Sequence, residues 1–308
     1  MKISHDLIGN TPLVHLPRIS RTMGANIFIK DESRNLTGSC KDRVAFRYLL
    51  KAKEHGEIRP KGAVVEACTS LLGLSIAVLG AKMNLFPYLV LCTDTPNERM
   101  ALLRAMDVQF MPYPPDLDML HAMDMADFHN REIWDSYQPR QFENPQGPLT
   151  HYEETGPELL HQCEEYGICP HIFVDGVASG ATISGVGRFL KERVPDVRIC
   201  AVEPEESPVL SGGKPGKHHI YGMGFGFVPK IFDRDAVDEI FTVSSRYASL
   251  CTQRLARVEG MLLGIGTGAN LAAAIDLTNR PENKGKNIII LGREAGASLT
   301  ALPPYGEY

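Results

Sequence analysis

Short apolar runs alternate with longer segments of helical period along this chain, and this alternation limits the possible folds more than any other feature. The short runs are rich in Val, Ile and Leu and carry few polar residues, as strands buried on both faces do. They lie at residues 64–66, 88–92, 171–177, 198–203 and 287–291.

The segments between these runs place apolar residues three and four positions apart, which is the spacing of one face of a helix. In residues 42–55, Val44, Tyr48 and Ala52 follow each other at intervals of four. The same spacing predicts helices at 97–106, 185–194, 246–259 and 269–277. Strands that alternate with helices predict the α/β class, in which twisted, mostly parallel sheets are covered by helices.

The chain has 308 residues, which favours two domains. Residues 139–157 are rich in Pro, Asn, Gln and Gly and are a candidate passage between them. A net charge of -5 without runs of like charge argues against binding to nucleic acid or to an anionic membrane. No apolar stretch is long enough to span a bilayer. We therefore expect a cytoplasmic protein with neither kind of partner.

The seven cysteines are odd in number and scattered, mostly among apolar residues. This pattern predicts buried thiols in a reducing compartment rather than a disulfide framework. Cys163 and Cys169 are six positions apart, and no His pair at ligand spacing accompanies them. We therefore expect no metal site.

The segment Thr-Gly-Ser-Cys-Lys-Asp-Arg at residues 37–43 leads directly into the first predicted helix. A lysine at that junction, Lys41, lies near the positive end of the helix dipole, which favours its neutral, nucleophilic amine. Neutral amines form Schiff bases with carbonyl groups. Lys41 is therefore a candidate nucleophile, and the alternative is a solvated lysine in a first helical turn.

A second candidate segment, Gly-Val-Ala-Ser-Gly-Ala-Thr-Ile-Ser-Gly at residues 176–185, follows a predicted strand and precedes a helix. Small residues there let backbone N–H groups converge on a phosphate, and Thr182 and Ser184 add hydroxyl donors. One alternative is a tight turn that needs glycine only for packing. Another is a dinucleotide site with Glu203 as the ribose-binding acid, but the glycines do not follow G-x-G-x-x-G.

A third candidate segment, Glu-Ala-Cys-Thr-Ser-Leu-Leu-Gly at residues 66–73, also passes from a strand to a helix. Backbone N–H groups at such a turn are able to hold a carboxylate. Leu71 and Leu72 contribute no polar side chain, so a packed turn remains the alternative.

Nine segments of the chain match, in order, the pattern of one enzyme family. They are IGNTPLV at 8–14, the Lys41 segment, NER at 97–99, QFENP at 141–145, TGPE at 155–158, the loop from Gly176, VEP at 202–204, SPVLSGG at 207–213 and GIGTGA at 264–269. The chain resembles the cysteine synthase (O-acetylserine sulfhydrylase) branch of the pyridoxal-phosphate enzymes, which also includes cystathionine β-synthase. The resemblance covers nearly the whole chain.

The resemblance implies a cofactor, pyridoxal 5'-phosphate, and a role for each matching residue. Lys41 would form the Schiff base with the cofactor, and Thr69 with neighbouring backbone, together with Gln141, would hold the substrate's α-carboxylate. The cofactor phosphate would be bound by Gly176, Ser179, Gly180, Ala181 and Thr182, where Ser179 and Ala181 replace the more usual Thr and Gly.

The implied reaction is β-replacement or β-elimination on a small amino acid that resembles O-acetylserine, serine or cysteine. Lys41 would remove the α-proton, the β-substituent would leave, and a small nucleophile such as sulfide would attack the resulting aminoacrylate. The cofactor acts as the electron sink, and the protein supplies orientation and charge.

Departures from the family pattern begin at the substrate loop, where Cys68-Thr69-Ser70-Leu71-Leu72-Gly73 stands in place of Thr-Ser-Gly-Asn-Thr-Gly. The family Asn that bonds the cofactor's phenolic oxygen is Leu71 here, and a leucine donates no hydrogen bond. Ser70 replaces a glycine and adds a hydroxyl beside the substrate carboxylate. We therefore expect Leu71 to line the cofactor and Ser70 the substrate.

A further departure lies near the C-terminus, where the family serine that meets the pyridine nitrogen is replaced by Arg293 or by Glu294. A glutamate would favour a protonated ring nitrogen and an arginine an unprotonated one, unless the side chain points to solvent. Phe225 also replaces a small residue in the turn at residues 222–227. It would narrow the substrate pocket, or else pack in the core.

The family architecture implies a smaller domain at residues 35–146, carrying Lys41 and the substrate loop. Residues 1–34 and 147–308 would form the larger domain with the phosphate loop, and the cofactor would lie in a cleft between the two. A homodimer is also implied. The leading hypothesis is an active enzyme, and its rival is a catalytically altered or inactive homologue that serves as a binding or regulatory partner.

Overall fold

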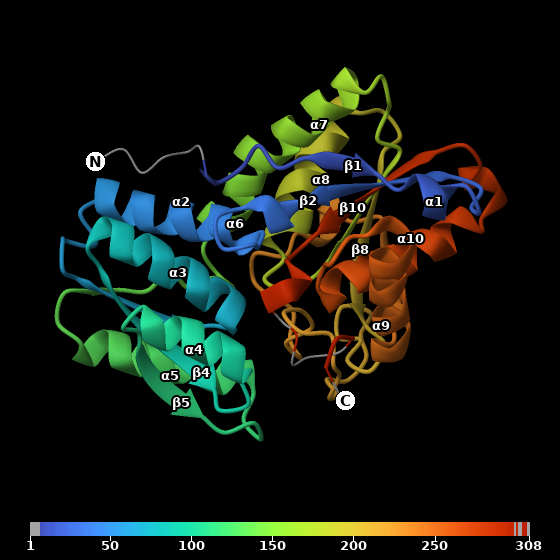
Figure 1. The fold of residues 1–308 in the computed structure, drawn as a ribbon. Coiled ribbons are helices and arrows are strands. Elements are labelled where there is room, and N and C mark those ends of the chain that lie inside the picture. The colour runs from blue at the N-terminus through green and yellow to red at the C-terminus, as the bar shows by residue number, and fades with distance from the viewer. Residues whose placement is uncertain (1–6, 299, 301–303, 307–308) are drawn as a thin grey trace.

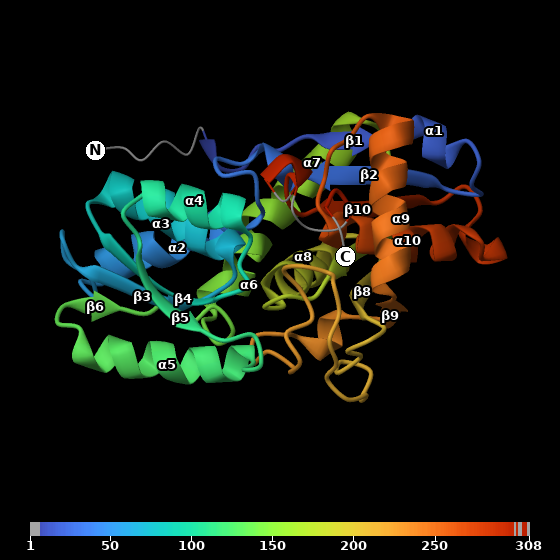
Figure 2. The same cartoon turned by 60° about the horizontal axis from the view of Figure 1, so that its bottom comes forward.

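The computed structural model describes residues 7–298, 300 and 304–306, apart from the side chains of Ser70 and Ser298. The chain forms two sheets, and each sheet has helices on both faces (Figures 1 and 2). Residues 63–137 supply the smaller sheet, and the strands that precede and follow them build the larger one. The predicted α/β class is confirmed.

The larger sheet has six strands in the order β1-β2-β10-β7-β8-β9. All neighbours are parallel except β1 and β2, which pair antiparallel. Because β7 and β10 are parallel neighbours, their carboxyl ends meet at one edge of the sheet. The strands are β1 (Leu13–His15), β2 (Asn26–Asp31), β7 (Ile172–Gly176), β8 (Arg198–Pro204), β9 (Glu239–Val243) and β10 (Asn287–Gly292).

Side chains of the larger sheet alternate between two cores, as the period of a strand requires. Ile288 and Ile290 pack with α9 (Ser245–Arg254) and α10 (Ile265–Thr278), whereas Ile289 between them packs with α7 (Gly156–Glu165) and α8 (Ala181–Arg193). Burial on both faces explains why these strands are continuous apolar runs in the sequence.

The smaller sheet has four parallel strands in the order β5-β4-β3-β6. One face is covered by α2 (Lys41–Glu54), α3 (Ser70–Met83) and α4 (Asn97–Ala105), and the other by α5 (Met119–Glu132), as Figure 2 shows. The strands are β3 (Ala63–Ala67), β4 (Phe86–Cys92), β5 (Gln109–Tyr113) and β6 (Ser136–Tyr137).

Each predicted strand and helix is present, but two helices begin four residues before their predicted starts. Helix α8 begins at Ala181 and α10 at Ile265, because small and polar residues interrupt the apolar periodicity in both first turns. The candidate passage at 139–157 is more ordered than its composition indicates. From Gln146 it is a continuous helical run through α6 (Gln146–Thr150), a π-helical turn (His151–Thr155) and α7. The domain division at residues 35 and 146 stays a prediction.

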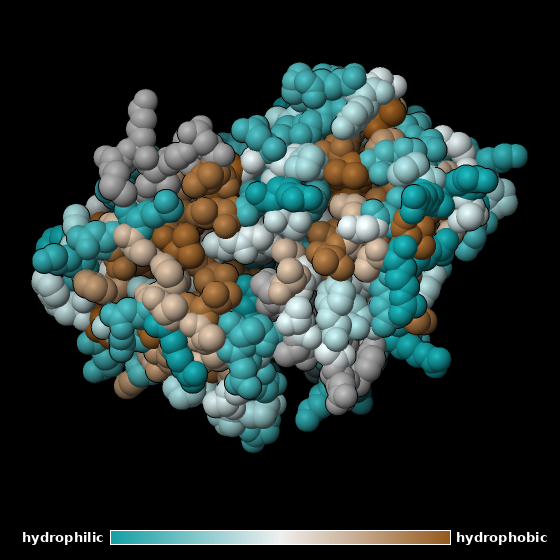
Figure 3. Space-filling model, in the orientation of Figure 1, coloured by the Kyte–Doolittle hydropathy of each residue, from teal (hydrophilic) through white to brown (hydrophobic). Residues whose placement is uncertain are grey.

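Apolar residues gather on one face of the molecule over α2 and α3 (Figure 3). Polar residues surround them on the same face. Of the helices in the described part of the chain, none combines the length and the apolar content needed to cross a membrane.

Candidate active site

Lys41 begins α2 and is buried, with 8% of its surface exposed. Its Nζ makes no hydrogen bond or ion pair with any residue that the structure describes. Burial lowers the pKa of Lys41, and the positive charge of Arg293 lowers it further. The amine is therefore held toward its neutral, nucleophilic form.

The loop from Gly176 to Thr182 connects β7 with α8 and is buried throughout. Gly180 is the N-cap of α8, with a φ of 85°, and a Cβ there would lie 2.9 Å from the Cα of Phe232. The backbone N–H groups of residues 180–183 precede the first intrahelical bond, which Ser184 donates to Gly180. Buried donors that converge at one helix end form a site for an anion.

His151 connects this loop to the π-helical turn. Its Nε2 lies 3.2 Å from the Thr182 Oγ1, and its Nδ1 lies 2.9 Å from the Thr155 Oγ1. Burial lowers the pKa of His151 to about 3, so the ring is neutral at physiological pH. A neutral imidazole has one donor and one acceptor, and it therefore fixes the orientation of the Thr182 hydroxyl.

The predicted substrate loop lies at the start of α3. Thr69 is the N-cap residue and is partly exposed, whereas Leu71 is 4% exposed. Leu71 lies against the turn at Gly222, where a Cβ would be 2.9 Å from the Leu71 Cδ1. The side chain of Ser70 lies outside the described residues.

Gln141 is brought to this same loop from a distant part of the chain. Its Nε2 donates to the carbonyl oxygen of Ala67 at 2.9 Å, and its backbone N–H donates to the Glu66 carboxyl group. Glu66 also accepts from the N–H of Arg140, which has a left-handed φ of 52°. Burial raises the pKa of Glu66 to about 8. One buried carboxyl group thus holds the backbone that carries Gln141.

Phe225 packs edge to face on Phe142, with ring centroids 5.4 Å apart. It is half-buried and contacts core residues of both sheets. These contacts support the predicted packing role, and the role as a pocket wall stays a prediction.

Arg293 and Glu294 follow β10, and an ion pair of 3.9 Å joins the Arg293 Nε to the Glu294 Oε2, but their hydrogen-bond partners differ. Arg293 is 4% exposed and donates from Nη1 to the Asp175 Oδ1 at 2.6 Å and to the carbonyl oxygen of Gly176 at 2.5 Å. Glu294 instead accepts from the N–H of Gly266 at the start of α10. Burial raises its pKa to about 6. Neither side chain points to solvent, and Arg293 is the one that contacts the Gly176 loop.

The chain as a whole is similar to known proteins. The family model for "Pyridoxal-phosphate dependent enzyme" matches residues 5–292. The chain belongs to this family. It is 38% identical to a probable cysteine synthase of Bacillus subtilis over 89% of this chain and 88% of the relative. It is 36% identical to a cysteine synthase of Staphylococcus aureus over 97% of this chain and 95% of that protein.

Among solved structures, the chain is similar to an O-acetylserine dependent cystathionine beta-synthase from Helicobacter pylori. The two share 30% identity and a TM-score of 0.91, over 99% of this chain and 100% of that one. The predicted family, the pyridoxal-phosphate cofactor and the assignment as an enzyme are confirmed by these comparisons.

The residues of this pyridoxal-phosphate enzyme fit the cofactor at two points. A buried lysine amine without a partner among the described residues suits the cofactor's aldehyde. The converging N–H groups of the Gly176 to Thr182 loop suit its phosphate, and the glycine at 180 keeps that space free of a Cβ.

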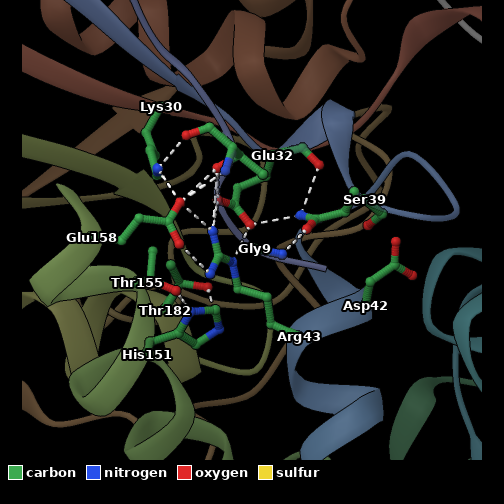
Figure 4. Close-up of polar contacts among 12 residues, drawn as sticks. Gly9, Lys30, Glu32, Ser39, Asp42, Arg43, His151, Thr155, Glu158 and Thr182 are labelled. Atoms are coloured by element: carbon green, nitrogen blue, oxygen red, sulfur yellow. Dashed lines mark hydrogen bonds and ion pairs between the residues drawn. The ribbon is translucent and has the colours of Figure 1, made fainter. Parts of the chain in front are cut away.

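Next to Lys41 the enzyme also has a buried cluster of charged residues that sequence reasoning missed (Figure 4). Arg43 binds two carboxylates, those of Glu32 at 2.7 and 2.8 Å and of Glu158 at 2.9 and 3.0 Å. Lys30 pairs with Glu158, so the cluster contains two basic and two acidic side chains. The sequence contained one signal for buried ion pairs, which is a charged residue inside an apolar strand. Lys30 in β2 marks this cluster, and Asp175 in β7 marks the separate pair with Arg293.

Proposed function

We propose that this enzyme catalyses β-replacement on O-acetylserine, with Lys41 as the residue that carries the cofactor. One observation supports the role of Lys41 above all. Its amine is buried, is held toward neutrality and has no partner among the described residues. The names of the similar proteins support the substrate, because they are cysteine synthases and an O-acetylserine dependent enzyme.

Each part of the site has a proposed task. The bound cofactor supplies the electron sink that allows the β-substituent to leave. Lys41 Nζ removes the α-proton of the substrate. Thr69, Ser70 and Gln141 bind the substrate carboxylate, and Phe225 with Leu71 narrows the pocket beside it.

The phosphate is held by residues Gly176, Ser179, Gly180, Ala181 and Thr182, with His151 orienting the Thr182 hydroxyl. Leu71 and Glu294 are proposed to act differently. Leu71 would line the cofactor without donating a hydrogen bond, whereas Glu294 would act through the start of α10, where it accepts from the N–H of Gly266.

Two measurements test this proposal. Borohydride reduction of the purified enzyme followed by peptide mass spectrometry should find the cofactor on Lys41. Turnover of O-acetylserine should be lost in Lys41→Ala and kept in Lys51→Ala, which removes an exposed ion pair from the same helix. Cofactor on a different lysine would refute the assignment.

The nucleophile is tested by comparing sulfide with larger thiols. The relatives named cysteine synthases support sulfide as the nucleophile. The name of the Helicobacter pylori enzyme, a cystathionine beta-synthase, supports a larger thiol instead. We propose sulfide, and a kcat/KM that is higher for a larger thiol would contradict it. If the cofactor is on Lys41 but no β-substituted serine turns over, the inactive homologue becomes the better interpretation. The comparisons do not favour that rival.

A cytoplasmic setting and a homodimer are also part of the proposal. The absence of disulfide patterning and the resemblance to cysteine synthases support them. Light scattering during gel filtration should give a mass of twice 34.0 kDa. A mass of one chain would contradict the dimer.

A further inference from the structure

Glu66 is a buried carboxyl group that forms no ion pair with a described residue. It lies in β3 with 1% of its surface exposed, and its hydrogen-bond partners among the described residues are two backbone N–H groups. The guanidinium of Arg140 makes its ion pairs elsewhere, with Asp127 and Glu143. Burying a carboxyl group without a cation costs stability, and departures of this kind concentrate at functional sites.

The two N–H groups belong to consecutive residues of the segment that carries Gln141. The N–H of Arg140 donates to the Glu66 Oε2 at 2.7 Å, and that of Gln141 donates to the Oε1 at 3.4 Å. Arg140 has a φ of 52°, a left-handed conformation that is unfavourable for a residue with a Cβ. The bond from Arg140 to a buried strand therefore stabilises a turn that is unfavourable by itself.

The side chain of Gln141 is held by the next residue of the same strand. Gln141 is 3% exposed, and its Nε2 donates to the carbonyl oxygen of Ala67 at 2.9 Å. A carbonyl oxygen accepts only from the NH2 end of an amide, so this bond fixes the orientation of the Gln141 amide. The NH2 group has a second N–H donor that Ala67 does not use. Thr69, the N-cap of α3, follows Ala67 by two residues, so this donor lies beside the substrate loop.

We propose that Glu66 is a positioning residue for recognition of the substrate's α-carboxylate. By holding the backbone at Arg140 and Gln141, it places the second N–H donor of the Gln141 amide at the substrate loop. Glu66 acts through Gln141 and does not itself touch the substrate. This proposal rests on the proposed role of Gln141 in binding the carboxylate.

The experiment is steady-state kinetics of the holoenzyme at pH 7. Because the β-substituent leaves before the nucleophile attacks, kcat/KM is measured separately for O-acetylserine and for sulfide. Glu66→Leu removes both acceptors and should lower kcat/KM for O-acetylserine by at least about tenfold, because a misplacement of about 1 Å can cost about a hundredfold. The value for sulfide should stay within about threefold of the wild type, because the amino acid is already bound when sulfide attacks.

Two conservative variants test the geometry of the contact. Glu66→Gln keeps an oxygen that can accept the bond from Arg140, and its kcat/KM for O-acetylserine should stay within about threefold of the wild type. Glu66→Asp keeps the carboxyl group but draws it back by one methylene group, and should lose at least about threefold. Glu66→Asp also provides the test where Glu66→Leu does not fold, and a wild-type value in Glu66→Asp would then overturn the proposal.

A double-mutant cycle tests whether Glu66 acts through Gln141. Gln141→Ala alone should lower kcat/KM for O-acetylserine. Adding Glu66→Leu to it should lower the value by less than about twofold more, because the side chain that Glu66 positions is already absent. Losses that multiply in the double variant would overturn the proposal.

Calorimetry of ligand binding to the holoenzyme gives a readout that needs no turnover. L-Alanine carries the α-carboxylate and has no β-substituent to lose, whereas L-alaninol has a hydroxymethyl group in place of the carboxylate. Glu66→Leu should weaken the binding of L-alanine by at least about tenfold and that of L-alaninol by less than about threefold, because only the carboxylate loses a charge-assisted bond. Equal weakening of both ligands would overturn the proposal.

Asp238→Leu is the matched control. Asp238 accepts from the N–H of Ile199 at 2.7 Å, the same length as the bond between Glu66 and Arg140. Ile199 lies near the amino end of β8, whereas the Gly176 loop follows the carboxyl end of its parallel neighbour β7. Asp238→Leu should therefore destabilise the protein without lowering kcat/KM, and a loss as large as that of Glu66→Leu would overturn the proposal.

Two further kinetic results would also overturn it. One is a kcat/KM for O-acetylserine in Glu66→Leu within about threefold of the wild type, and the other is an equal loss for O-acetylserine and for sulfide. A wild-type enzyme that does not turn over O-acetylserine refutes the proposed function, and the calorimetry then still decides this inference. Turnover by the wild type with no change in the Glu66 variants refutes this inference alone.

Discussion

Replacement of Arg43 by glutamine should destabilise the protein strongly. The Arg43 guanidinium bonds Glu32, Glu158 and Thr11, which lie outside the substrate loop and the phosphate loop. Burial alone would raise the pKa of Glu32, but the Arg43 guanidinium, with smaller contributions from Lys30 and the Thr11 hydroxyl, outweighs burial, and the pKa falls from 4.5 to about 2. This difference corresponds to about 3 kcal/mol of stabilisation at neutral pH. Breaking a buried ion pair from one side typically costs about 3 to 5 kcal/mol, so the two estimates agree.

The pH dependence of the loss has a definite sign. A carboxyl group whose pKa is lowered by folding stabilises the folded state above its unfolded pKa and loses that effect as the pH falls through its folded pKa. The wild type should therefore lose the contribution of Glu32 between about pH 4.5 and pH 2, and the variant has no such contribution to lose. The difference in stability between the two should fall to less than half of its neutral value by about pH 3.

Denaturant unfolding of the holoenzyme, followed by circular dichroism from pH 7 to pH 3, measures this difference. Arg47→Gln is the control, because Arg47 lies one turn further along α2 and pairs with Glu153, which is 44% exposed. Exposed pairs contribute about 0 to 1 kcal/mol. Glu32→Gln combined with Arg43→Gln should recover part of the loss, because no unpaired charge remains buried. A loss below about 1 kcal/mol in Arg43→Gln, or one that does not change with pH, would refute the reasoning.

Three further predictions concern single positions. Gly185→Ala should unfold the start of α8 and cost at least about 2 kcal/mol in denaturant unfolding, because a Cβ there would lie 2.2 Å from the carbonyl oxygen of Pro148; an unchanged midpoint would contradict this. Glu66→Gln should be more stable than the wild type above pH 8 and similar to it near pH 5. Burial raises the pKa of Glu66 to about 8, so the wild type loses stability as the pH rises from the pKa of Glu66 in the unfolded chain toward 8. Thermal unfolding at the two pH values checks this, and equal shifts at both would count against it. Leu71→Asn should shift the absorbance maximum of the bound cofactor, because an amide adds a hydrogen-bond donor that leucine lacks, whereas Leu72→Asn should only destabilise.

The architecture was predictable from the sequence wherever a segment is buried on both faces. Strands such as β7 and β10 are apolar runs because each lies between two layers of helices. The start of α8 was missed because residues 180–184 contain one large apolar side chain, Ile183, among small residues, and one such residue shows no helical period. The helical run from Gln146 was missed because Pro, Gly and Asn usually mark turns.

The candidate site was predictable where one segment carries a whole function, as the Lys41 segment and the Gly176 loop do. The charged pairs around them were not, because their members are far apart in the sequence. Asp175 and Arg293 are 118 positions apart, and Arg43 and Glu158 are 115 apart. No local pattern specifies which distant residue neutralises a buried charge. A charged residue inside an apolar strand indicates only that a partner exists.

Three consecutive residues of the first turn of α2 have three different environments, and this arrangement constrains how the enzyme can move. Asp42 accepts from Thr37 and from Ser75 of α3, which belongs to the smaller sheet. Arg43 is bound by Glu32 and Glu158, which adjoin the larger sheet. Helix α2 also shares an apolar core with α3, so its first turn connects the smaller sheet to the charged residues beside the larger one. A movement of the smaller sheet relative to the larger one would therefore act on Lys41 from both sides, because Asp42 is bound to one part and Arg43 to the other. We expect the cost of such a movement to be set mainly by the buried charged bonds of Arg43.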